Sequence, residues 1–242
     1  MSTLVGVRRA LTGGGSIDQG GGQGIPNPQF WLPLMDAGAG AVNTGPARAF
    51  SGSAPTFTRA TAAWTKLASG LWASVATGIA RSCYLGATTA VGAYGGYFSE
   101  EARTNLCLQS RDLSTTWTAL NATLLKDQIG IDGVASSASS MLATAINGSA
   151  LQTITEAATA SALSMFIKRI TGTGTVTIQQ GATTLEVSGS INSSTYTRVE
   201  LDATVLNPAI GIVLGTSGDK IAVDMVQFEN GGFAIILSNL NC

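Results

Sequence analysis

The amino-acid sequence predicts an all-β protein: an antiparallel two-sheet β-sandwich of the jelly-roll type, preceded by an extended, largely irregular N-terminal arm and connector. Two patterns indicate this fold class. From about residue 108 apolar residues recur at every second position, which is the period of a half-buried strand. Turn residues separate these runs at intervals of about 8 to 12 residues, the spacing that is typical of a sandwich or barrel.

The individual strands are read from this alternation. The clearest is 161–170. One face of this strand is expected to carry Leu163, Met165, Ile167 and Arg169, and the other Ser164, Phe166 and Lys168. The segment 136–145 is rich in small residues and fits either a short helix or a strand. Further strands are expected at 175–179, 184–187, 196–201, 210–214 and 220–228.

Composition divides the chain into three parts. Residues 1–50 are rich in Gly, Pro, Ala and Asn and cannot bury enough apolar surface to offset their backbone entropy. We therefore expect an anchoring arm held by other subunits; the alternative is an arm folded loosely onto its own domain. Residues 51–107 are expected to form a connector with short strands, and 108–242 the jelly-roll sandwich.

One cluster in the arm is suited to anchor it to a partner. Prolines lower the entropy that is lost on docking, and aromatic side chains carry large apolar area. The expected partner-anchoring residues are Ile25, Pro26, Phe30, Trp31 and Leu32.

The charge and histidine content exclude several functions. Charged residues make up only 11% of the chain, against about a quarter in ordinary soluble domains, and the net charge is −1 with scattered Lys and Arg. We therefore expect no nucleic-acid partner. No apolar run approaches the ~20 residues of a membrane span. Because the chain has no histidine, Ser-His-Asp and Cys-His catalysis and histidine-ligated zinc are excluded.

The cysteines do not suggest a disulfide framework. Cys83, Cys107 and Cys242 are odd in number and lack metal-type spacing. We expect two small core residues and a terminal thiol, in a chain made in a reducing cytoplasm. No Walker A loop or dinucleotide fingerprint is present, so no cofactor is expected.

Three sequence blocks resemble a known family. They are Phe-Thr-Arg-Ala-Thr-Ala at 57–62, Glu-Glu-Ala-Arg-Thr-Asn-Leu at 100–106 with the Ser, Asp and Trp that follow up to 117, and Gln-Phe-Glu-Asn-Gly-Gly-Phe at 227–233. In this order they are similar to a motif of tail and accessory structural proteins of tailed bacteriophages. The resemblance implies a non-enzymatic virion component, either a head decoration or a tail or fibre accessory protein. The resemblance further implies that this component is assembled in the bacterial cytoplasm and attached through its N-terminal region to capsid or tail subunits of the virion.

The resemblance also implies a homo-oligomer, for which a trimer is the common arrangement. It implies that the connector wraps against the sandwich or against neighbours. Jelly rolls of this kind resemble carbohydrate-binding modules as well, so a glycan-binding adhesion module for attachment to the host surface is the alternative. Sugar sites usually present aromatic faces, and most aromatics after Trp117 fall in core-like registers. The aromatics after Trp117, of which this majority is a part, are Phe166, Tyr196, Phe228 and Phe233.

The second and third blocks are predicted to form a structural junction. Arg103 is suited to clasp a loop by pairing with Glu100 or Glu101. A catalytic pairing of those two carboxylates is disfavoured because adjacent residues of an extended segment point to opposite faces. We assign to this junction Glu100, Glu101, Arg103, Asn105, Trp117, Gln227 and Glu229.

Two functional roles for carboxylate side chains remain as alternatives to a purely structural role. Glu229 is expected to accept backbone N–H groups in the turn after the last long strand, and the alternative is a sugar or metal contact. A calcium site is the other alternative, although the dense acidic spacing of a calcium loop is missing, and we expect no bound metal. Its ligands would be Asp219 with Asp224, or Asp127 with Asp132.

Overall fold

The computed structural model describes residues 63–67, 69–77, 82–84, 94–97 and 103–233. The predictions made for the arm and its anchors, and for Glu100 and Glu101, concern residues outside these ranges. All the described residues belong to one unit that spans Ala54–Cys242. Within these residues the chain forms strands and no helix, so they contain no helix that could cross a membrane.

The described residues of the connector form four short strands. They pair as two antiparallel hairpins, β1 with β2 and β3 with β4. Their bounds are β1 Ala63–Lys66, β2 Trp72–Val75, β3 Ser82–Tyr84 and β4 Tyr94–Tyr97.

The sandwich contains ten strands in the described range 103–233. They are β5 Thr118–Leu120, β6 Ala122–Gln128, β7 Ala138–Ala143, β8 Gly148–Thr153, β9 Ala160–Thr171, β10 Val176–Gln180, β11 Thr183–Glu186, β12 Thr197–Thr204, β13 Ala209–Leu214 and β14 Lys220–Asn230.

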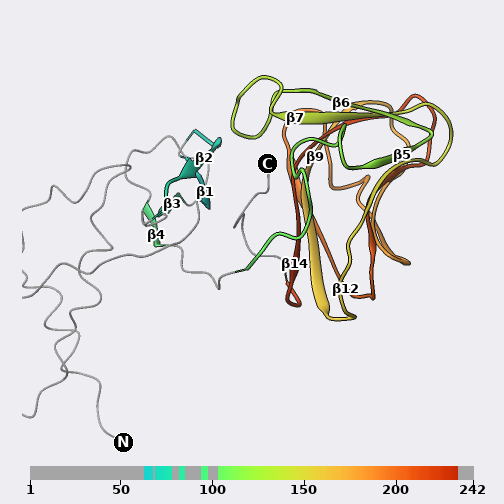
Figure 1. Ribbon diagram of the computed structural model, residues 1–242. Coiled ribbons are helices and arrows are strands. Elements are labelled where there is room, and N and C mark those ends of the chain that lie inside the picture. Colours follow the sequence, from blue (N-terminus) through green and yellow to red (C-terminus); the bar gives the residue numbers. More distant parts are fainter. Residues whose placement is uncertain (1–62, 68, 78–81, 85–93, 98–102, 234–242) are drawn as a thin grey trace, which may run out of the picture. The chain divides into compact units, whose positions relative to one another are not determined.

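These strands form two antiparallel five-stranded sheets (Figure 1). The first sheet has the order β11-β10-β13-β8-β5 and the second β12-β9-β14-β7-β6. From β7 to β10, and again from β11 to β14, consecutive strands alternate between the two sheets. This repeated crossing is the winding of a jelly roll, so the predicted fold class is confirmed.

The inward faces of the two sheets form one core. In β9 the alternation holds as predicted: Leu163, Met165 and Ile167 are fully buried and pack with Ile178 and Ile212 of the opposite sheet. Each such side chain contributes about 1.5 to 3 kcal/mol when it leaves water. The segment 136–145, which fitted a helix or a strand, contains β7, and its buried Met141 belongs to this core.

The outward face of the second sheet carries a smaller apolar cluster. Phe166 of β9 lies there, and the ring of Trp72 from β2 meets it edge-on with 5.6 Å between ring centroids. The backbone N–H of Trp72 also donates to the carbonyl of Ile131 at 3.0 Å. The β1–β2 hairpin therefore packs against the sandwich, as the resemblance implied for part of the connector.

A bulge interrupts β14. Asp224 pairs with Phe166 and Gln227 with Ser164, so β14 has one residue more than β9 between these pairs. The extra residue is accommodated at Met225, a fully buried side chain with φ of 49°. A positive φ is strained for a bulky residue, and the structure around the bulge must hold it in place.

Candidate functional site

The segment that follows Arg103 takes the place of a neighbouring strand along β14. Strand β7 pairs with β14 only from Lys220 to Val223. Beyond that point the N–H of Leu106 donates to the carbonyl of Phe228 at 2.8 Å, and the N–H of Val226 donates to the carbonyl of Ser110 at 2.8 Å. The second motif block therefore completes the hydrogen bonding of the last strand, which buried backbone groups require.

Asn105 is the centre of this contact. Its side chain is fully buried. Its amide nitrogen donates to the hydroxyl of Ser110 at 2.8 Å and to the carbonyl of Val226 at 3.1 Å. Its oxygen accepts from the N–H groups of Cys107 at 3.0 Å and Phe228 at 2.9 Å. Asn105 thus supplies both a donor and an acceptor to the bulged part of β14, as a strand backbone would.

The other predicted junction residues lie in different surroundings. Trp117 is buried in the main core, with 6% of its side chain exposed. Gln227 donates to Glu229 at 3.1 Å, and both side chains are buried. Glu229 was expected in the turn after the last strand, but β14 extends to Asn230 and places Glu229 inside the strand. The sequence reading ended the strand too early because Asn230 and the glycines after it looked like one turn.

Arg103 contacts Phe233, which follows the end of β14. Its guanidinium donates to the carbonyl of Phe233 and lies over the ring of the same residue, 4.3 Å from the centroid. Its expected partners Glu100 and Glu101 are outside the described residues. Within the described part, Arg103 therefore ties the start of the sandwich to the segment after β14.

A buried ionic network that the sequence reading missed holds the bulge. Arg111 donates to the carboxylate of Asp224 through Nε at 2.8 Å and Nη2 at 3.1 Å, and to Asp132 through Nη1 at 2.8 Å. The N–H groups of Ile131 and Met225 also donate to Asp224, each at 2.9 Å. The Asp224 side chain is fully buried. The network holds in place Met225, whose φ is positive, and the loop that contains Asp132.

The ionisation of this network follows from its contacts. Burial acts to lower the pKa of Arg111, but hydrogen bonds to Asp224 and Asp132 raise it above its ordinary value. Partial burial acts to raise the pKa of Asp132, yet the bonds from Arg111 and the Val134 N–H hold it below its ordinary value. Burial raises the pKa of Asp224, and Arg111 acts against that rise. Arg111 supplies the positive charge between two carboxylates that the sequence had suggested as calcium ligands.

No metal cluster is seen elsewhere in the part of the chain that the structure describes, where no group of three or more His, Cys, Asp or Glu could hold an ion. Cys107 is buried, as expected of a small core residue, and burial raises the pKa of its thiol. Cys83 and Cys242 lie where side chains are not described.

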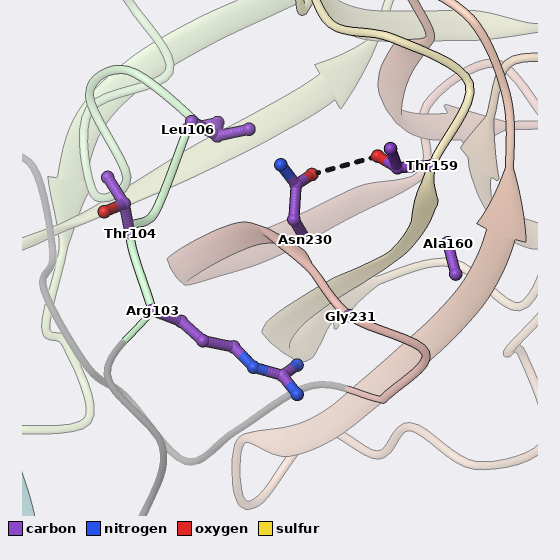
Figure 2. A pocket seen from close by; sticks show the side chains of 7 residues that line it. All are labelled: Arg103, Thr104, Leu106, Thr159, Ala160, Asn230 and Gly231. Atoms are coloured by element: carbon purple, nitrogen blue, oxygen red, sulfur yellow. Dashed lines mark hydrogen bonds between the residues drawn. The ribbon is translucent and has the colours of Figure 1, made fainter.

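A pocket of about 470 Å³ lies at one end of the sandwich (Figure 2). Its volume is within the ~300 to 1,000 Å³ of small-molecule sites. It is formed by the segment after Arg103, the start of β9 and the end of β14. The residues that line it are Arg103, Thr104, Leu106, Thr159, Ala160, Asn230 and Gly231.

Some polar groups of this pocket make only long hydrogen-bond contacts within the protein. The Thr159 hydroxyl contacts the Asn230 oxygen and the carbonyl of Ala157, both at 3.5 Å, which is long for a hydrogen bond. Thr104, Thr159 and Asn230 are all exposed, so their polar groups are accessible to a ligand. Nearby Phe233 is 56% exposed, whereas Phe166 and Phe228 are buried.

Comparisons with known proteins give a loose structural likeness only. No protein-family model and no curated protein matches the chain. A module pair of Clostridium thermocellum endo-1,4-beta-D-xylanase 10B, a CBM22-1 with a GH10 module complexed with xylohexaose, aligns at 12% identity and a TM-score of 0.42. That alignment covers 58% of this chain and 30% of the other.

Two further solved structures show the same level of likeness. The CBM22-1 xylan-binding domain of Paenibacillus barcinonensis Xyn10C has 10% identity and a TM-score of 0.38, over 56% of this chain and all of that one. The enzymatically active domain of bacteriophage CBA120 tailspike protein 4 has 16% identity and a TM-score of 0.36, over 52% and 21%. The function proposed below therefore depends on this chain's own residues.

Proposed function

We propose that this chain is a non-enzymatic structural component of a tailed-bacteriophage virion that displays its β-sandwich on the outer surface. The observation that carries the proposal is the use of the motif residues. Asn105 is wholly engaged in holding the segment that leads into the sandwich against β14. Asn105 therefore has a structural role where the chain enters the sandwich, which supports the proposal.

Attachment would occur through the N-terminal region, to a capsid or tail surface. A surface poor in charge resists association weakly, which suits a subunit that is packed into a lattice. Many weak contacts repeated by symmetry then add through multivalency. A homo-oligomer, with a trimer as the arrangement that the resemblance implies, belongs to this proposal.

Particle incorporation tests the proposal. Virions purified from cells that produce the tagged chain should contain it at a fixed copy number, and the same chain without residues 1–50 should be lost from them. Absence of the full-length chain from purified particles would reject the virion role. Normal incorporation of the shortened chain would reject attachment through the arm.

A second candidate function is adhesion to a host-surface glycan, and the pocket at the end of the sandwich favours it. Saccharide sites combine apolar surface with a few placed polar groups, and this pocket offers both. An oligosaccharide array probed with the full-length chain tests this candidate. Specific, saturable binding supports it, and the lack of any binding rejects it.

A further inference from the structure

We infer that the pocket lined by Arg103, Thr159 and Asn230 is a saccharide site that holds one or two units of an oligosaccharide, with the Asn230 amide as its main recognition group. This inference rests on the second candidate function and names its site. It draws on three features of the pocket: its size, the hydrogen-bonding groups in it and the residues that close it.

The volume limits what the pocket can hold. About 470 Å³ is the space of roughly 15 water molecules at ~30 Å³ each. A hexose has twelve non-hydrogen atoms, so the pocket has room for one or two sugar rings. The pocket is therefore suited to contact one or two units of a glycan.

The polar groups of the pocket match a ligand that is rich in hydroxyl groups. Asn230 offers an exposed side-chain amide, whose oxygen has a long contact with Thr159. The hydroxyls of Thr104 and Thr159 each donate and accept. A sugar hydroxyl also does both, so neighbouring hydroxyls of one ring can pair with the amide and a threonine together.

The remaining walls are apolar or held rigid. Leu106 and Ala160 provide the apolar surface on which the C–H face of a sugar ring packs. Arg103 extends toward the turn at Gly231 (Figure 2). Its guanidinium is fixed there by stacking over the ring of Phe233. Gly231 has a φ of 129°, and a Cβ at this position would collide with Arg103. The positive φ favours glycine at position 231, and the guanidinium of Arg103 packs against it on this side of the pocket.

The test uses the full-length chain and defined probes. An array of cello-, xylo-, malto- and galacto-oligosaccharides of one to six units, with uronic-acid counterparts, identifies the best binder, and titration calorimetry then measures its affinity. Asn230→Ala should weaken binding of that probe about tenfold, which corresponds to ~1.4 kcal/mol and the loss of one or two hydrogen bonds. Affinity should stop rising beyond two sugar units, because further units lie outside the pocket.

Thr184→Ala is the matched control, since Thr184 is exposed on the edge strand β11, outside the pocket. It should bind as the unchanged chain does. Thermal denaturation of Asn230→Ala and Thr184→Ala shows whether each variant remains folded. If Asn230→Ala lowers stability, a second pair of variants replaces it: Thr159→Ala should weaken binding, whereas Thr159→Ser, which keeps the hydroxyl, should retain it. If a probe binds but neither Asn230→Ala nor Thr159→Ala weakens it, the site is elsewhere and the inference is overturned while adhesion stands. If no probe binds, both fail together.

Discussion

Replacing Asn105 with alanine tests whether the motif block holds the sandwich together. The change removes four hydrogen bonds, to Ser110, Val226, Cys107 and Phe228, from a side chain with no exposed surface. A buried hydrogen bond contributes a net ~1 kcal/mol, and a partner left unpaired costs about 1 to 3 kcal/mol. The free energy of unfolding should therefore fall by about 4 kcal/mol.

This magnitude is large for one residue. Domains are stable by about 5 to 15 kcal/mol, and in a domain of this size each kcal/mol shifts the melting temperature by about 2 to 4 °C. The melting temperature should therefore fall by about 8 to 16 °C, as measured by circular dichroism at 218 nm or by scanning calorimetry.

Asn192 provides the control. Its side-chain oxygen accepts from the N–H groups of Ser194 and Thr195, each at 2.8 Å, but it is exposed, so water replaces those bonds when alanine is introduced. Asn192→Ala should cost no more than ~1 kcal/mol. If the two variants melt within 2 °C of each other, the view that Asn105 substitutes for a strand is refuted.

Three further predictions follow from the described contacts. Arg111→Met should lower the free energy of unfolding in urea by about 3 to 5 kcal/mol, because the buried Asp224 carboxylate loses its positive partner and keeps only backbone N–H donors. Adding Asp224→Asn should recover part of the loss, and no recovery would count against the pairing. Cys107 should react with iodoacetamide at pH 8 only after unfolding, since burial raises its pKa, and peptide mass spectrometry showing it modified in the native chain would contradict this. Gly211→Ala should lower the yield of soluble protein, because its Cβ would collide with the carbonyl of Ala150 on β8.

The sequence reading succeeded where period two is strong and local. It placed β9, β10, β11, β12, β13 and β14 within a few residues of their bounds and assigned the faces of β9 correctly. It left 136–145 open because small residues fit a helix as well as a strand. It did not separate β5, β6 and β8, since sequences such as Gly148–Thr153 contain few of the β-branched and aromatic residues that mark a strand.

The candidate sites were harder to predict than the strands. Asn105 was found because it lies in a recognisable motif, but its role depends on Val226, which is 121 residues away. Arg111 stands in the same block and was passed over, because Asp224 is 113 residues away and gives no local sign of pairing. The pocket joins three segments, and the sequence shows none of their proximity.

The sequence by itself determined that this is an all-β chain with a sandwich at its C-terminal end, a weakly charged surface and no histidine chemistry. Those properties follow from composition and from alternation within single strands, which depend on near neighbours only. The tertiary structure decided that Asn105 stands in for a strand, that Arg111 holds the bulge of β14, and that Asn230 faces a pocket. Such pairings depend on the order of strands in a sheet and the register between them, so they appear only when distant segments meet.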